Sequence, residues 1–340
     1  MPKKTSRNGI MKQKTAVTRM NINQLEMVSV DCLVSEKHPN RKLKEALDFG
    51  RLEKSVDIKE SDLGATGYTL PRLIMCLILQ FMEDLSDRHF ERFMAENTAG
   101  KWFCEFGLSE KTPDFTTICK FRKRMGLEQI KNLFDAVKQQ LKEKGYMGEV
   151  FTFVDATALI SKLQMWEEKD QALSEGYEKF NNEVIEKFAK DKEVRIGAKS
   201  KNKFWFGFKK FASVDMQSGM INNVKVTKAN VTDDNHEAVK AVLPSQGAVT
   251  GDKGFVGAIS AIEEAGCHSM IILKDNMNDK NKDKDRFISK IRAPFEGVFS
   301  KQQRRVRYKG TDKNQAAEYL YAIGFNFRRL LVLQAAAALA

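Results

Sequence analysis

Val150-Phe-Thr-Phe-Val-Asp155 is the point at which the hydrophobic pattern of this 340-residue chain changes from helical to strand-like. Aromatic and β-branched residues dominate this run, which is typical of a strand in the core of a sheet. A second run of this kind, Ala248-Val-Thr-Gly-Asp252, predicts another buried strand. Because both runs end in an aspartate, we expect two carboxylates at the carboxyl ends of two core strands.

The sequence around these two runs predicts an α/β domain with a mixed sheet. Gln217-Ser-Gly219 is a hairpin turn between two further strands. After the first strand, the elements follow in the order strand, strand, helix, strand, helix, strand, helix, in which the third of these strands is the run that ends at Asp252. Their expected ranges are strands over 204–215 and 220–228, helices over 233–242 and 254–265, a strand over 269–273, a charged loop over 274–285, and a last helical region that includes Glu296.

The N-terminal half of the chain has a helical pattern and no strand pattern. We expect helices over 69–82, from the capping residues Ser86 and Asp114 onwards, and over 127–144. The expected organisation is a basic flexible arm over 1–27, a helical domain over 28–147, an α/β domain over 148–331 with an acidic helical insert at 164–193, and a C-terminal tail over 332–340.

Composition narrows the class of protein. There are 57 Lys and Arg against 45 Asp and Glu, so the formal net charge is +12. This excess favours a polyanionic partner, and nucleic acid is the commonest one. The five cysteines are scattered without a C-x-x-C pair, which argues against a zinc site or a disulfide framework. No apolar run reaches the roughly 20 residues that span a bilayer, and the N-terminus has no signal-peptide pattern, so we expect a cytoplasmic protein.

The two strand-end aspartates predict a metal site. Carboxyl ends of neighbouring strands meet at one edge of a sheet, so Asp155 and Asp252 would repel each other unless a cation lay between them. Carboxylate oxygens favour Mg²⁺ or Mn²⁺, and phosphodiester chemistry uses two such ions about 4 Å apart. Glu296 is the candidate third carboxylate. A strand-end aspartate is more often a turn cap than a ligand, so the inference rests on the combination.

The strand order resembles the RNase H-like fold, and the motifs resemble the DDE transposases of bacterial insertion sequences, in particular the insertion-sequence-five group. The similarity covers residues 28–331. It is carried by Phe153-Val-Asp-Ala-Thr, Phe206-Gly-Phe-Lys-Lys-Phe-Ala-Ser-Val-Asp, Thr227-Lys-Ala-Asn-Val-Thr-Asp, Thr250-Gly-Asp-Lys-Gly-Phe, Arg292-Ala-Pro-Phe-Glu-Gly-Val-Phe, Val306-Arg-Tyr-Lys-Gly and Gly324-Phe-Asn-Phe-Arg-Arg, with Leu85-Ser-Asp-Arg and Asp114-Phe-Thr-Thr-Ile-Cys-Lys-Phe-Arg in the N-terminal half.

This resemblance implies an RNase H-like catalytic domain preceded by an all-helical DNA-binding domain. It implies a catalytic, metal-binding triad of Asp155, Asp252 and Glu296, with two Mg²⁺ or Mn²⁺ ions per active site. The expected partners are transposon-end and target DNA and a second copy of the chain, as a homo-oligomer that is a dimer on DNA in the bacterial nucleoid. The chemistry would be DNA cleavage followed by strand transfer.

The chain departs from the family pattern around Glu296. Ser289 stands where the family often has Tyr, and Gln302 stands where it often has Lys. Pro294 biases Ala293 away from helical backbone, which allows the last helix to begin at Pro294 and Arg292 to lie off the face of Glu296.

DNA contacts are expected from basic residues in both halves, although a plain surface lysine is nearly as good a reading of Lys209 and Lys253. The candidates are Lys120, Lys123, Arg124, Lys209, Lys253, Arg292, Lys301, Arg304 and Arg305. Two other functions stay open: an RNase H-like nuclease without strand transfer, and a catalytically silent transposase descendant that only binds DNA.

Overall fold

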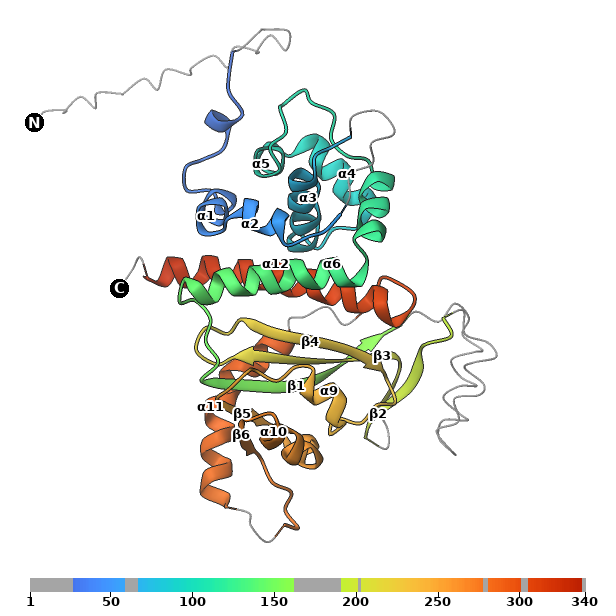
Figure 1. Ribbon diagram of the computed structural model, residues 1–340, viewed down its shortest axis with the longest axis vertical. Coiled ribbons are helices and arrows are strands. Elements are labelled where there is room, and N and C mark those ends of the chain that lie inside the picture. The colour runs from blue at the N-terminus through green and yellow to red at the C-terminus, as the bar shows by residue number, and fades with distance from the viewer. Residues whose placement is uncertain are drawn as a thin grey trace, which may run out of the picture.

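The computed structural model describes residues 27–58, 67–161, 191–200, 203–277, 281–300 and 305–337. Figure 1 shows a group of helices from the N-terminal part on one side and a sheet with further helices on the other. Between them lie two long helices, α6 (Phe115–Glu143) and α12 (Thr311–Ala337). The expected basic arm, except for Met27, and most of the expected acidic insert lie outside the described residues.

The N-terminal part is helical, as the sequence predicts. Ser86 caps one helix by accepting a hydrogen bond from the backbone N–H of His89, and Asp114 caps α6 by accepting from Thr117. Each cap satisfies a backbone N–H group that the first turn leaves without a partner. The helices before α6 are α1 (Pro39–Ala46), α2 (Phe49–Lys54), α3 (Leu70–Met82), α4 (Asp87–Glu96) and α5 (Thr98–Phe103).

Helix α6 is two helices joined at Gly126. This residue has φ 62° and ψ −171°, a backbone conformation that side chains other than that of glycine rarely adopt. The segment before the kink packs against α4, and the segment after it packs along α12. Gly126 therefore divides α6 into a part that belongs to the helical group and a part that covers the sheet.

The sheet has the strand order expected of an RNase H-like core. Its path is β2-β3-β1-β5-β6, with β4 paired to β3. β1 is antiparallel to β3 and parallel to β5. The strands are β1 (Phe151–Ile160), β2 (Arg195–Ser200), β3 (Lys203–Asp215), β4 (Ile221–Lys228), β5 (Ala248–Gly251) and β6 (His268–Ile271), and the helices that follow β4 are α9 (His236–Lys240), α10 (Ile259–Glu264) and α11 (Lys282–Ser300). The sequence did not predict β2.

Helix α12 lies along β4 and supplies hydrogen-bond partners to that strand. The side chain of Gln315 accepts from Val226 N at 2.6 Å and donates to Val224 O at 3.0 Å. Asn326 holds both backbone groups of Ile221 in the same manner. The two buried amides thus satisfy strand groups on the side of β4 away from β3, where a partner strand would otherwise be needed.

The apolar core does not follow the expected division at residue 147. One buried cluster combines α3, α6 and α12 with residues of β1, β3 and β4, including Phe153. A second cluster lies under the opposite face and includes Val154, Val249 and Ile262. Neighbouring residues of β1 therefore point to opposite sides of the sheet, and both sides are covered.

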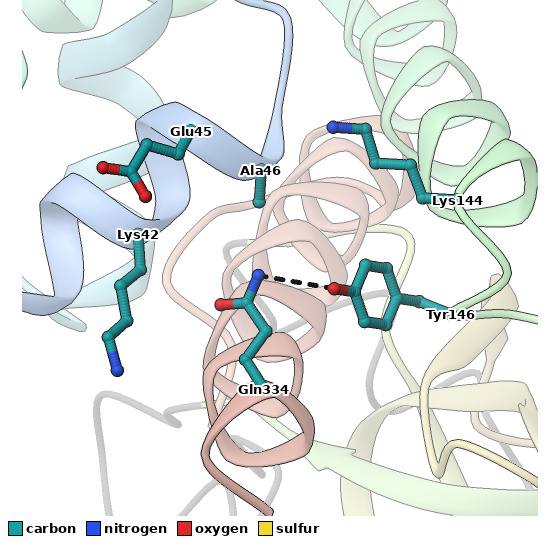
Figure 2. Close-up of a pocket in the computed structure, with 6 residues that line it drawn as sticks. All are labelled: Lys42, Glu45, Ala46, Lys144, Tyr146 and Gln334. Carbon is teal, nitrogen blue, oxygen red and sulfur yellow. Dashed lines mark hydrogen bonds between the residues drawn. The ribbon is translucent and has the colours of Figure 1, made fainter. Parts of the chain in front are cut away.

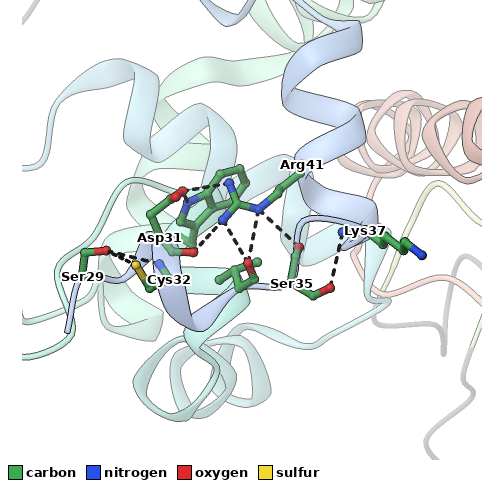
Figure 3. A network of polar contacts seen from close by, with 8 residues as sticks. Ser29, Asp31, Cys32, Ser35, Lys37 and Arg41 are labelled. Atoms are coloured by element: carbon green, nitrogen blue, oxygen red, sulfur yellow. Dashed lines mark hydrogen bonds and ion pairs between the residues drawn. The ribbon is translucent and has the colours of Figure 1, made fainter.

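A polar network fixes the first described residues onto the helical group. Arg41 donates to Asp31 Oδ1 at 2.8 Å and to the carbonyl oxygens of Val34 and Ser35 (Figure 3). Its guanidinium group lies 4.5 Å from the centre of the Trp102 ring, whose N–H also donates to Asp31. This network determines where the chain enters the helical group.

Candidate active site

Asp155 lies in the middle of β1 and is partly buried. It shares a strand face with Phe153, because residues two apart in a strand point the same way. Burial is the main factor that raises the pKa of Asp155, to about 6, and the nearby charge of Asp252 raises it further. A hydrogen bond from Ala156 N and the charges of Lys199 and Arg292 oppose this rise.

Asp252 follows β5 directly and caps the short 3-10 helix Lys253–Ala258. Its Oδ1 accepts from Gly254 N at 2.9 Å. In the parallel pairing of β1 and β5, Phe153 is the partner of Thr250. Two residues further along each strand, this register brings Asp155 beside Asp252. Asp155 and Asp252 are thus neighbours. The expectation that Asp155 ends its strand is wrong, because β1 continues to Ile160, whereas Asp252 does follow the last residue of β5.

Helix α11 carries Glu296 and Arg292 on one face. It continues without interruption through Pro294, so the alternative that Pro294 allowed, a helix beginning there, does not occur. Glu296 accepts from Arg292 at 3.3 Å, one helical turn earlier, and its side chain is 60% exposed. Arg292 is 9% exposed and its guanidinium lies 4.8 Å from the centre of the Phe153 ring.

These contacts place the arginine between the first aspartate and the glutamate. Among the described residues, no group of three or more His, Cys, Asp or Glu side chains could hold a metal ion. The third ligand therefore stays a prediction. The donors near β1 and β5 fit such an ion, because two carboxylates lie near each other at a partly buried place, where the charge of Asp252 disfavours ionisation of Asp155.

Lys209 does not occupy the exposed position that a DNA contact needs. Its side chain is 6% exposed and its ammonium group lies 2.7 Å from Asp233 Oδ1. A Cβ atom at Gly254 would lie 3.3 Å from Asp233 Oδ2 and 2.9 Å from Asp252 Oδ1. Asp233 and Asp252 therefore converge on one glycine, with Lys209 balancing the charge of Asp233.

Sequence reasoning missed Asp233. The sequence signal was available, because Asp233 ends the family-like segment Thr227–Asp233, but nothing in it indicates which lysine this carboxylate would meet.

Lys253 is on the surface next to Asp252. Its ammonium group lies 2.8 Å from Asp275 Oδ2, and both side chains are largely exposed. Hydrogen bonding to Asp275 is the main cause that raises the pKa of Lys253, and the charge of Asp285 adds to it. Two acids therefore hold this lysine beside the paired aspartates.

The other expected DNA contacts differ in position. Lys120, Lys123 and Arg124 are exposed on α6, and Arg305 is exposed before α12. Lys301 and Arg304 lie outside the described residues. The exposed basic residues among these candidates therefore lie in both halves of the chain.

A cleft of about 400 Å³ lies away from these residues, where α1 and the C-terminal ends of α6 and α12 meet. Figure 2 shows Tyr146 and Gln334 facing each other across it, joined by a 3.5 Å hydrogen bond. It contains neither Asp155 nor Asp252 in its lining.

Two families match the chain. Residues 28–124 match the family described as Transposase domain (DUF772), and residues 164–323 match the Transposase DDE domain. Asp155 lies between the matched segments, whereas Asp252 and Glu296 lie inside the second. None of the helices in the described part of the chain is both long and apolar enough to cross a membrane.

Solved structures with a similar arrangement are distant. A piggyBac transposase synaptic complex with hairpin DNA has 13% identity and a TM-score of 0.29, over 72% of this chain. The match spans 48% of that piggyBac chain. A Mos1 transposase paired-end complex has 9% identity and a TM-score of 0.18, over 88% of this chain and 94% of that chain. With TM-scores this low, these structures give no evidence about the fold or the function of this chain.

Proposed function

Because the chain belongs to the DDE transposases, as the two family matches show, we propose that it binds the ends of an insertion sequence, cuts there and joins the cut ends to target DNA. The observation that carries the proposal is the proximity of Asp155, within β1, and Asp252, directly after the parallel strand β5. The insertion-sequence-five group is the one whose motifs the chain resembles, and membership of that group is part of the proposal.

Asp155, Asp252 and Glu296 would hold two Mg²⁺ or Mn²⁺ ions. When bound, such ions make a water or 3′-hydroxyl nucleophilic and stabilise the leaving oxygen. Arg292, between Asp155 and Glu296, orients the glutamate through their 3.3 Å contact. Within the described part of the chain its buried Nε has no hydrogen-bond partner. Because the Arg292 side chain is nearly as buried as that of Lys209, its role is to position Glu296 and not to contact DNA.

The remaining contacts to DNA are assigned to exposed basic groups. Lys253 would exchange its bond to Asp275 for a phosphate near the paired aspartates. Arg305, together with Lys301 and Arg304, would contact the DNA backbone. Lys120, Lys123 and Arg124 would contact DNA away from the catalytic residues. We propose that two copies of the chain assemble on the DNA ends, in the cytoplasm at the bacterial nucleoid.

A strand-transfer assay tests this function. Uncut and pre-cut duplexes from either flank of the coding sequence are incubated with supercoiled plasmid and Mg²⁺; cleavage of the uncut duplex and joining of the pre-cut duplex to the plasmid are measured. We expect the wild type to join ends and Asp155→Asn to join and cleave none while still binding the duplex. Asp283→Asn, which changes an exposed acid of α11, is the matched control and should retain activity.

The outcomes separate the proposal from the alternatives. Cleavage without joining would indicate a nuclease, and binding without either reaction would indicate a silent descendant. Activity of Asp155→Asn equal to that of the wild type would refute the assignment of the first carboxylate.

A further inference from the structure

The first half of α6 presents a polar face that is largely exposed in the described part of the chain. Thr116, Cys119, Lys120 and Lys123 recur at the three- and four-residue spacing of one helix face. Cys119, Lys120 and Lys123 are exposed and Thr116 is half-buried, whereas Ile118, Phe121 and Met125 are buried on the other side. Phe115–Met125 contains no acidic residue.

Helix α4 holds this face rigidly and adds cations beside it. Asp87 binds Arg122 through a 2.7 Å ion pair that is mostly buried. The guanidinium of Arg88 lies 4.3 Å from the centre of the Phe115 ring, at the start of the same helix. Arg88 is exposed, as is Arg124 at the other end. A polar helix face is thus flanked by arginines at both of its ends.

Resting on the proposed function, we propose that this face enters the major groove of duplex DNA and reads the terminal sequence of the element. A helix from Phe115 to Met125 is about 16 Å long, and the major groove, about 12 Å wide, admits one α-helix. Lysines at the centre of such a face donate to guanine O6 and N7, and small side chains contact the methyl group of thymine. The arginines at its ends bind phosphates and fix the register.

The charge pattern favours base reading over general adhesion to phosphate. Thr116 and Cys119 place two small uncharged side chains among the cations of the face, a size that suits contact with base edges and with the thymine methyl group. The kink at Gly126 directs the rest of α6 onto α12. The segment proposed to read DNA therefore ends at Met125, before the part of α6 that covers the sheet.

Cysteine footprinting of the unmodified chain tests this placement. Cys119 and Cys32 are exposed, whereas Cys76, Cys104 and Cys267 are buried. A duplex that the wild type selects from a random library is compared with a scrambled duplex of equal length. We expect the selected duplex to slow alkylation of Cys119 by N-ethylmaleimide at least tenfold relative to the scrambled one, with Cys32 unaffected. Equal alkylation of Cys119 with both duplexes, while the selected duplex still binds more tightly, would overturn the inference.

A pair of lysine variants on the same helix provides the second test. Lys120→Ala should change the sequence that the library selection returns, whereas Lys131→Ala, an exposed lysine beyond the kink, should return the wild-type sequence. Arg88→Ala should weaken binding to all sequences alike and lower the salt dependence by about one charge. An unchanged selected sequence for Lys120→Ala would contradict base reading.

The two proposals fail separately. A chain that selects a sequence through Lys120 but never joins ends would refute the proposed function and leave the reading face intact. If the chain joins ends, but Cys119 is protected equally by all duplexes and Lys120→Ala selects the wild-type sequence, the reading face is refuted and the proposed function stands.

Discussion

The partly buried position of Asp155 disfavours the charged form of its carboxyl group. Its pKa is raised to about 6, so ionisation destabilises the folded chain. Because the folded chain binds the proton of Asp155 more tightly than the unfolded chain does, protonation stabilises the fold. This stabilisation is fully present below the pKa of the group in the unfolded chain, and it is lost as pH rises through the pKa in the folded chain. The relevant window therefore lies between about pH 4 and pH 6, and ionisation costs at most about 3 kcal/mol.

Asp155→Asn should accordingly stabilise the metal-free protein at pH 7.5. The increase in melting temperature should shrink as pH falls from 6 and vanish below about pH 4, where the carboxyl group is protonated in both the folded and the unfolded chain. Thermal melts in EDTA check this, with Asp283→Asn as the exposed control. Mn²⁺ should stabilise the wild type and not the variant. An identical melting difference at all pH values would show that the substitution acts through packing rather than charge.

Lys209 and Asp233 make a second prediction at this scale. Asp233→Asn leaves a buried ammonium group without its anion, which should destabilise the protein by about 1–3 kcal/mol. Lys209→Met should leave the salt dependence of DNA binding unchanged, because the 6% exposed side chain does not reach a phosphate. Urea unfolding and binding at several salt concentrations measure the two effects. A lower salt slope for Lys209→Met would restore the DNA contact that the sequence suggested.

At the scale of elements, the kink of α6 depends on one residue. Gly126→Ala introduces no steric clash, since no atom lies within 4 Å of the added Cβ. It does force an alanine into a backbone conformation that is nearly restricted to glycine, at a cost of about 1–3 kcal/mol. Gly297→Ala, also unobstructed but inside helix α11, should instead stabilise by about 0.5–1 kcal/mol. Equal and small effects of both changes in urea unfolding would argue against the kink.

The elements that the sequence predicted are those whose environment is simple. β5 is a short apolar run that ends before Asp252, so its end could be foreseen, and so could the proximity of Asp155 and Asp252. The end of β1 could not, because the strand continues past Asp155 to Ile160 through half-buried residues that lie outside the apolar run. Helix α12 could not, because it is buried on several sides and its buried positions include polar residues such as Gln315 and Glu318. Its apolar residues therefore do not form a single stripe.

The burial of Lys209 and Lys210 in β3 could not be predicted for a similar reason. Alternation along a strand assigns residues to faces, but it does not tell whether a face is covered. Lys209 meets Asp233 on one side and Lys210 meets Glu318 of α12 at 2.9 Å on the other, and both lysines are buried. A sheet covered on both faces needs partners for its cations, and those partners come from segments far away in sequence.

The whole molecule is held together by α12. Gly324 approaches so closely that an added Cβ would lie 3.1 Å from the backbone of Met82. Arg328 and Arg329 bind the carbonyl oxygens of Met82 and Ser218, one in each half of the chain. The helical group and the sheet thus share one apolar cluster and one helix.

Unfolding should therefore be a single cooperative transition. We expect the calorimetric and van't Hoff enthalpies to agree, and helical and sheet signals to be lost at the same denaturant concentration. Two resolved transitions would instead support the division at residue 147 that the sequence suggested.

The position of α12 also has a consequence for biosynthesis. On the ribosome, α3, α6 and β4 all emerge before the helix that covers them, so a nascent chain cannot close its main core until residues 311–337 have been made. Until then the apolar faces of these elements are exposed to chaperones and proteases. Chains interrupted before α12 should be cleared rather than accumulate as a folded half. The cell thus receives either the whole protein or nothing that persists.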